Sequence, residues 1–138
     1  MPTFLFDKIV FGPVKSRRLG ISLGINLLPS TRKICNFNCI YCECGWTMSS
    51  AIQNESLPSR IEVYEALEKR LSGMKQKKQA IDVITYAGNG EPTLHPEFPG
   101  IIDDSIKLRD KYFPEAKIAV LSNSSSIGNP AIREALLK

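Results

Sequence analysis

The chain has 138 residues, of which 43% are hydrophobic and 23% are charged, with nine glycines and nine prolines. This length predicts one domain that can bury a core, and the balanced composition excludes collagen-like and low-complexity proteins. No apolar run reaches the roughly 18 residues that a membrane-spanning helix needs. The first twelve residues have neither a basic start nor a small-residue cleavage site, so we expect no secretion signal and a cytoplasmic location by default.

The net charge of +4 is distributed unevenly along the chain. Residues 1–50 hold six Lys or Arg against Asp7 and Glu43, whereas residues 51–138 hold twelve basic and twelve acidic residues. The excess positive charge therefore lies in the segment that also contains all four cysteines. An anionic ligand near this segment is one interpretation, and a solvated surface is the other.

Two strands are predicted in the first 30 residues. Phe4–Val14 is apolar and β-prone, and this pattern ends at Gly12 and Pro13. Gly20–Leu28 alternates between apolar residues and small or polar ones, as a strand does, and Pro29 ends it.

The first helix is predicted to begin after Ser59, which forms a Ser-x-x-Glu capping box with Glu62. Apolar residues follow at helical spacing, and Gly73 is the predicted stop. The helically spaced residues are Ile61, Tyr64, Leu67, Leu71 and Met74.

Two further strand–helix units follow. Ala80–Ala87 is a predicted strand and Phe98–Tyr112 a predicted helix, while Lys117–Leu121 is a short apolar strand that suits a sheet covered on both faces. Asn129 then caps a third helix that has Pro130 at its first position. This alternation predicts an α/β fold with a parallel sheet and right-handed crossovers.

Ligands of such sheets bind beyond the carboxyl ends of the strands. The loops 29–58, 88–96 and 122–128 each follow a predicted strand. We therefore expect these three loops to gather at one edge of the sheet.

All four cysteines lie within ten residues: Cys35, Cys39 and Cys42 are spaced as Cys-x3-Cys-x2-Cys, and Cys44 follows. Disulfides would constrain little in so tight a loop, and nothing indicates an oxidising compartment. Structural zinc usually takes two separated pairs of ligands, which fits this spacing poorly. An iron–sulfur cluster suits closely spaced thiolates, and three cysteines leave one iron open for chemistry.

The cysteine spacing, with Tyr41 before the last cysteine, resembles that of the radical S-adenosylmethionine (radical SAM) superfamily. The segments 12–20 and 22–29 ahead of it resemble one branch, the iron–sulfur oxidoreductases similar to wybutosine-tRNA synthesis enzymes and, more distantly, to the molybdenum-cofactor cyclase. The resemblance implies a partial (β/α)6 TIM-like barrel with parallel strands. Residues 1–138 would be a single radical SAM core domain, the N-terminal half of that barrel, truncated after the third strand–helix unit.

The resemblance implies that Cys35, Cys39 and Cys42 bind a [4Fe–4S] cluster whose open iron chelates S-adenosylmethionine (SAM). The reduced cluster then cleaves SAM to methionine and a 5′-deoxyadenosyl radical, which takes a hydrogen atom from a substrate. An external one-electron reductant similar to flavodoxin or ferredoxin is expected. The alternatives are a non-catalytic iron–sulfur or zinc module and an activating enzyme of the glycyl-radical type.

Two further segments resemble SAM-binding segments of the superfamily. Gly90 and Glu91 match the Gly-Gly-Glu motif, which holds the amino group of SAM, although Asn89 splits the glycine pair. Ser122 and Asn123 match a Thr-Asn-Gly segment that contacts the carboxylate or ribose of SAM; they are also good turn formers.

The remaining candidate residues have a functional and a structural interpretation. Tyr41 matches an aromatic residue that packs near the adenine, or it packs the loop. Arg17 and Arg18 suit phosphate or carboxylate and would contact a nucleotide or tRNA substrate, or they pair with a nearby acid. Cys44 is expected to be a spare buried thiol rather than a ligand. His95, the only histidine, is expected to be structural or capping.

Overall fold

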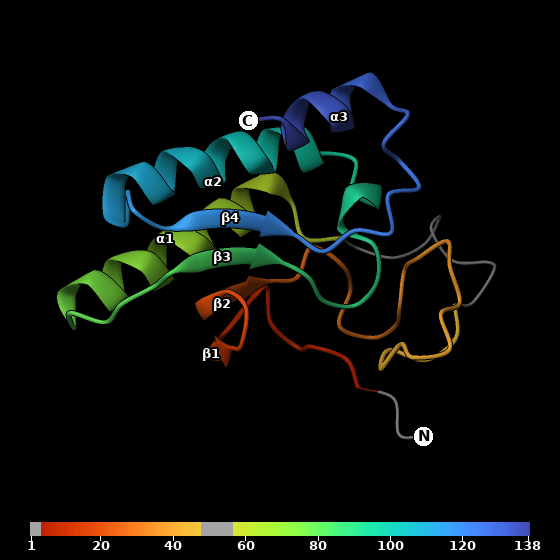
Figure 1. Cartoon of the computed structure of the whole chain (residues 1–138), viewed down its shortest axis with the longest axis horizontal. Helices are drawn as coiled ribbons and strands as arrows, with labels where there is room; N and C mark the ends of the chain where they lie inside the picture. Colours follow the sequence, from red (N-terminus) through yellow and green to blue (C-terminus); the bar gives the residue numbers. More distant parts are fainter. Residues whose placement is uncertain (1–3, 48–56) are drawn as a thin grey trace.

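The computed structural model describes residues 4–47 and 57–138. In this part of the chain a four-stranded sheet carries helices on one side (Figure 1). Within the predicted loop 29–58, residues 48–56 lie outside the described residues. The elements in chain order are β1 (Val10–Ser16), β2 (Gly20–Ile25), α1 (Arg60–Gln76), β3 (Val83–Tyr86), the short helix η1 (Pro92–Leu94), α2 (Phe98–Tyr112), β4 (Lys117–Val120) and α3 (Pro130–Leu136).

The strands lie in the order β1-β2-β3-β4. β2, β3 and β4 are parallel neighbours, as predicted, whereas β1 pairs with β2 in the antiparallel sense. A turn over residues 17–19 joins β1 to β2, so no helical crossover is needed there. Because crossovers between parallel strands are right-handed, α1 and α2 cover the same face of the sheet, and α3 packs on α2 (Figure 1). The result is an α/β fold whose sheet is mostly parallel.

β1 differs from its prediction, since the strand does not end at Gly12 and Pro13 but continues to Ser16. A register shift between Phe11 and Val14 accommodates the two residues as a bulge. Gly12 adopts a φ of 91° there, a conformation that glycine reaches without steric cost. A bulge in an edge strand therefore explains why this Gly-Pro pair interrupts the pairing without ending the strand.

α1 begins as predicted. The Ser59 side chain accepts from the backbone N–H of Glu62, whose carboxylate accepts from the backbone N–H of Ser59 at 2.6 Å. The predicted stop at Gly73 is wrong, because one glycine costs a helix only about 1 kcal/mol and the next residue, Met74, is buried. Ile61 is 69% exposed and does not join the core face. The buried face of α1 consists of Val63, Leu67, Leu71 and Met74.

The strand that is covered on both faces is β3, all four of whose residues are buried. β4 was expected to have this environment, but its residues are only partly buried and Lys117 is exposed. β4 forms the edge of the sheet within the described residues, so it has one neighbouring strand where β3 has two.

The core fills the space between the sheet and α1 and α2, with Leu23, Ile84, Leu67, Leu71, Phe98 and Ile101 among its fully buried members. A bidentate ion pair joins α1 to α2: Nε and Nη2 of Arg60 donate to the Asp104 carboxylate at 2.7 and 2.9 Å. The Arg60 guanidinium holds the pKa of Asp104 below its ordinary value. No helix within the described residues is long and apolar enough to cross a membrane.

Candidate functional site

The parallel strands end at one edge of the sheet, and the loops that follow them contact one another there (Figure 1). Ile34, in the loop after β2, forms a parallel bridge with Gly90 in the loop after β3. The backbone N–H of Ile34 donates to the Asn89 carbonyl at 2.9 Å, and the N–H of Glu91 donates to the Ile34 carbonyl at 3.0 Å. The expected gathering of the loops is thus confirmed for these two.

The loop after β4 joins them through Asn123. Its side-chain amide donates to Asn36 Oδ1 at 2.9 Å and lies 3.6 Å from Cys35 Sγ, within hydrogen-bond range of sulfur. The amide of Asn36 in turn donates to Ser125 Oγ at 2.8 Å. The third loop therefore contacts the first at the first cysteine of the motif.

Gly90 is required by the chain itself at this crossing. Its φ is 134°, and an added Cβ would lie only 1.8 Å from the carbonyl oxygen of Ile34. No other residue type allows the two backbones to approach this closely. The bridge that joins the first two loops thus depends on this glycine.

Glu91 is only 2% exposed, and its carboxylate links the second and third loops. Oε2 accepts from the backbone N–H and hydroxyl of Thr93, at 3.1 and 2.7 Å, and from Ser122 Oγ at 3.0 Å. Oε1 accepts from the backbone N–H of Asn123 at 2.5 Å. These four donors match the roughly four lone-pair positions of a carboxylate, with three donors on Oε2 and a single donor on Oε1.

Asn89 is a site residue whose importance the sequence did not reveal. Its side chain is fully buried and pairs with the backbone of Phe6, accepting from the N–H at 2.7 Å and donating to the carbonyl at 2.8 Å. It also donates to the Pro29 carbonyl at 2.8 Å. Asn89 therefore fastens the N-terminal segment and the loop after β2 to the loop after β3. The only indication in the sequence is the asparagine itself, which stands between two glycines.

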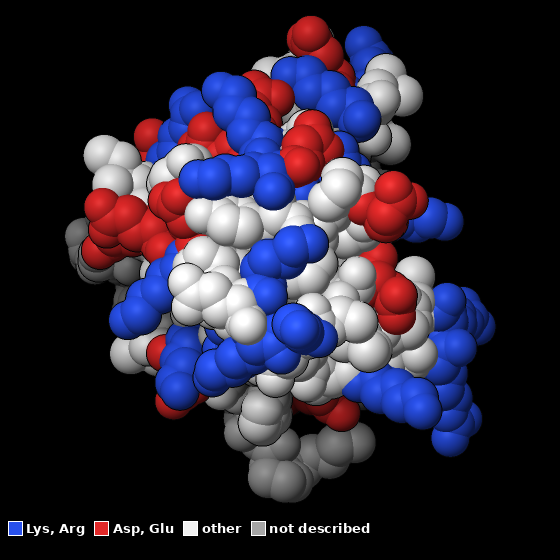
Figure 2. All heavy atoms as spheres, turned by 90° about the vertical axis from the view of Figure 1, so that its left-hand side faces the viewer, with Lys and Arg blue, Asp and Glu red and all other residues white. Residues whose placement is uncertain are grey.

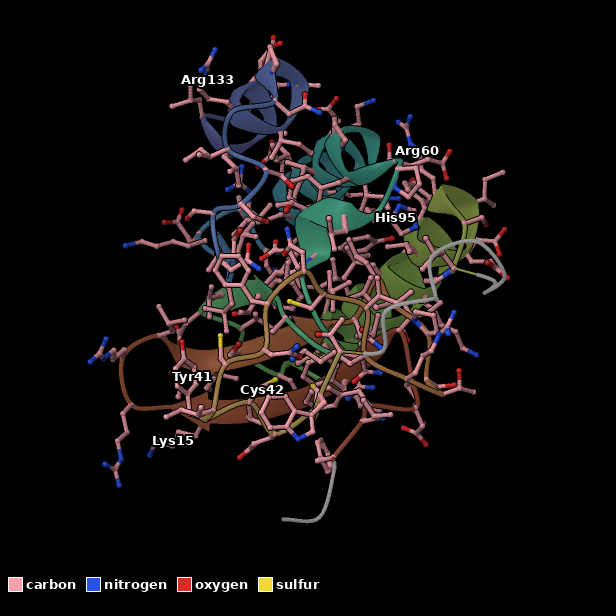
Figure 3. The ribbon with its side chains drawn as sticks, turned by 90° about the vertical axis from the view of Figure 1, so that its right-hand side faces the viewer. Lys15, Tyr41, Cys42, Arg60, His95 and Arg133 are labelled. Carbon is pink, nitrogen blue, oxygen red and sulfur yellow. The ribbon has the colours of Figure 1, made fainter. Side chains whose placement is uncertain are left out.

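The cysteine loop, residues 33–47, is open by comparison. All four cysteines are free and partly buried, contrary to the disulfide interpretation. Ile40 is 90% and Tyr41 82% exposed. Figure 3 faces this edge of the molecule and shows the loop, with Tyr41 and Cys42, in front of the strands. Its thiols are therefore accessible from solvent.

The thiols of the cysteine loop differ in acidity. Burial opposes ionisation of Cys42, but the backbone N–H of Cys44 and the ammonium of Lys33 outweigh it and lower the pKa of Cys42. Burial, and the negative charge on Cys42, raise the pKa of Cys44 to about 11. The Cys44 thiol also donates to the Gly88 carbonyl at 3.4 Å. Such a thiol is protonated at neutral pH, which favours the interpretation of Cys44 as a spare thiol.

The donors of this loop are thiolates, which both an iron–sulfur cluster and a zinc ion accept as ligands. Among residues 4–47 and 57–138, no three Cys, His, Asp or Glu side chains converge on one point, as a zinc ion requires. In a cubane cluster each thiolate binds a different iron, so the sulfurs can lie further apart. Cys35, Cys39 and Cys42 are partly buried thiols in the same loop as Lys33.

His95 has the structural role that was expected. Its ring is buried, with Nε2 2.7 Å from the Pro58 carbonyl and Nδ1 accepting from the backbone N–H of Glu97 at 3.0 Å. Both ring nitrogens are thereby engaged by backbone groups. His95 fastens the start of α2 to the segment before α1.

Arg17 and Arg18 do not join these loops. They lie exposed in the turn before β2, at the end of that strand opposite to the cysteine loop. Figure 2 views that end of the molecule, where many Lys and Arg side chains lie among fewer Asp and Glu. The positive charge that the sequence groups with the cysteines is therefore divided between the two ends of the sheet, and only Lys33 is buried in the cysteine loop.

Comparison with known proteins gives consistent matches. The sequence model described as "Radical SAM superfamily" matches residues 30–138. A UPF0026 protein of Methanocaldococcus jannaschii is 37% identical over 129 residues, which are 94% of this chain and 37% of that protein. UPF0026 proteins of two Helicobacter pylori strains are each 41% identical, over 93% of this chain and 39% of their own length.

The chain thus spans about two fifths of the length of these relatives. No solved structure matches it. The sequence model covers the cysteine loop and the loops after β3 and β4, all of which meet at one edge of the sheet. On this evidence the chain belongs to the radical SAM superfamily.

Proposed function

We propose that the protein is a radical SAM enzyme that holds a [4Fe–4S] cluster on Cys35, Cys39 and Cys42 and cleaves SAM reductively. The observation that carries the proposal is the contact of the cysteine loop with the loops of Glu91 and Asn123. Cluster and SAM require thiolates, an acceptor for an ammonium and donors for a carboxylate within one site. The three loops supply all of these groups.

When bound, a reduced cluster supplies one electron to the sulfonium of SAM, which breaks into methionine and a 5′-deoxyadenosyl radical that takes a hydrogen atom from the substrate. The electron comes from an external reductant similar to flavodoxin or ferredoxin. In this scheme the exposed ring of Tyr41, next to Cys42, offers a stacking surface to the adenine.

The remaining residues bind and orient SAM. Glu91 Oε1, which accepts from the Asn123 N–H alone, is the oxygen that we assign to the ammonium of SAM, while the Gly90 backbone keeps this loop against the cysteine loop. Ser122 and Asn123 are fixed by the same carboxylate and present their polar groups to the carboxylate or ribose of SAM. Their placement before SAM arrives lowers the entropy cost of binding.

The substrate that we propose is a tRNA, in line with the resemblance to wybutosine-tRNA synthesis enzymes. β2 runs from the turn that holds Arg17 and Arg18 towards the loop that holds the cysteines, and its six residues span about 20 Å at the usual rise per residue. A ligand that contacts both regions must span this length. A folded tRNA does so and a mononucleotide does not. Weaker tRNA binding by the Arg17→Ala, Arg18→Ala double variant would support this assignment, and unchanged binding at low salt would overturn it.

The test of the enzymatic proposal is anaerobic reconstitution of the intact protein, with iron and zinc counted on the same sample. We expect about four irons per chain, in line with the cubane stoichiometry. The EPR signal of the dithionite-reduced sample should shift when SAM is added, and 5′-deoxyadenosine should form. Zinc in place of iron, or a cluster whose signal ignores SAM, would contradict the proposal and favour a non-catalytic metal-binding module.

A further inference from the structure

Lys33 is a buried cation inside the cysteine loop. Its side chain is only 4% exposed, although it precedes the first cysteine by two residues. An ammonium is costly to bury unless acceptors surround it. Its Nζ donates to the Phe37 carbonyl at 3.2 Å and to the Gly45 carbonyl at 3.0 Å.

These two carbonyls lie on opposite sides of the loop. Phe37 stands between the first two cysteines of the motif, and Gly45 follows the last cysteine of the chain. Thr47 adds to the same closure, since its hydroxyl donates to the Phe37 carbonyl at 2.8 Å. One side chain therefore fixes the separation between the start and the end of the segment that carries Cys39 and Cys42.

Both acceptors of these hydrogen bonds are neutral carbonyl oxygens. Three thiolates and a cluster would bring negative charge into the same loop, and each electron added to the cluster would increase it. A fixed cation nearby favours the reduced form, since the net charge around a cluster is one of the factors that set its potential.

We propose that Lys33 is a positioning residue of the cysteine loop, whose ammonium joins the two sides of the loop and places a permanent positive charge beside the cluster. The charge role rests on the proposed function, whereas the role in joining the loop is a property of the chain before any cluster is bound. The two roles can therefore be measured separately.

The first measurement is hydrogen exchange of the intact protein without metal, in the wild type and in Lys33→Met. The methionine keeps the length of the side chain but removes its three donors. Amides of residues 34–47 should exchange roughly tenfold faster or more in Lys33→Met, because opening of the loop no longer breaks these hydrogen bonds. Lys15→Met, which removes an exposed lysine from β1, is the matched control and should leave this exchange unchanged.

The second measurement is the midpoint potential of the reconstituted cluster, followed by EPR during a redox titration. Lys33→Met should shift the potential in the negative direction, whereas Lys33→Arg should stay close to the wild type because it keeps the charge. Far-UV circular dichroism first checks that each variant is folded, and Lys33→Gln replaces Lys33→Met if the methionine variant is not.

The proposal requires both results. Unchanged exchange over residues 34–47 would overturn the positioning role, and an unchanged potential in a fully loaded Lys33→Met protein would overturn the charge role. A wild-type protein that binds no four-iron cluster would overturn the proposed function, but the exchange measurement would still decide whether Lys33 joins the loop.

Discussion

The cysteine loop and the loop after β3 meet at the same edge of the sheet, yet they are built in opposite ways. In the loop after β3 the side chains of Asn89, Glu91, Thr93 and His95 are all buried, and each makes hydrogen bonds within the chain. The cysteine loop exposes Ile40, Tyr41 and Trp46 and leaves its thiols free.

This difference indicates that one part of a site for a large cofactor is ordered by the protein alone, whereas another part is ordered when the cofactor binds. Buried polar groups whose hydrogen bonds are all made give a rigid, unique arrangement. A loop of accessible thiols gains much of its order when metal binds, because the binding energy of the metal contributes to its folding. We therefore expect the loop after β3 to be a preformed half of the site and the cysteine loop to be completed by its cluster.

The largest effect that would test this difference between the cysteine loop and the loop after β3 is the loss of the cluster. Cys35→Ala, Cys39→Ala and Cys42→Ala should each abolish binding of the four-iron cluster, because each removes one of the three thiolates that we propose as its ligands. The iron content and the EPR signal of the reconstituted protein measure the outcome. The fold of the apo protein should persist in each variant, since none of these side chains belongs to the core.

Cys44→Ala is the matched control on the same loop. Its thiol has a raised pKa and donates to the Gly88 carbonyl, so the variant should retain its iron. Loss of iron from Cys44→Ala equal to that of the other three would show that the ligand set is wrong.

The sequence predicted those parts of the fold that depend on local patterns. The capping box of Ser59 and Glu62 was recognisable because its residues lie three apart, and so was Asn129, whose side chain accepts from the N–H of Ala131. The antiparallel direction of β1 was missed, although residues 15–19 between the two predicted strands are too few for the crossover that parallel neighbours need. The partial exposure of β4 was missed because an apolar run does not say how many neighbours a strand has.

The same limit applies to the site. That three loops after parallel strands would meet follows from topology, and the contact of Asn123 with Cys35 bears this out. The contacts of Asn89 with Phe6, 83 residues away, and of Lys33 with Gly45 have no signature in a local pattern. Buried polar residues of this kind are recognised only when the chain is folded, because their partners come from distant segments.

Glu91→Ala is expected to lower both the stability of the protein and its affinity for SAM, with a smaller effect than the loss of the cluster. The change leaves the hydroxyls and backbone N–H groups of Thr93, Ser122 and Asn123 without their acceptor in a largely buried setting. The free energy of unfolding should fall by about 2–3 kcal/mol, as unpaired buried donors usually cost. SAM affinity should fall as well, whereas the iron content should stay near that of the wild type.

Thermal unfolding and SAM binding to the reconstituted protein are the measurements for this variant. Glu115→Ala, which removes an exposed carboxylate before β4, is the control and should change neither. An unchanged stability of Glu91→Ala would contradict a preformed second half of the site, and an unchanged SAM affinity would contradict its role as the acceptor of the ammonium.

The smallest effect on stability is expected at Tyr41. Stacking of its ring on the adenine and packing of its ring in the cysteine loop predict different results for the same substitution. The ring is 82% exposed, so Tyr41→Ala should change the free energy of unfolding by no more than about 0.5 kcal/mol. If the ring stacks on the adenine, the same change should weaken SAM binding by about 1–3 kcal/mol, the usual value of a base on an aromatic ring. Calorimetric titration of SAM into the reconstituted protein measures this, with the exposed Trp46→Ala as a control on the same loop. A loss of stability with unchanged SAM affinity would instead assign Tyr41 to the packing of the loop, and the cysteine loop would then be less open than its exposed side chains indicate.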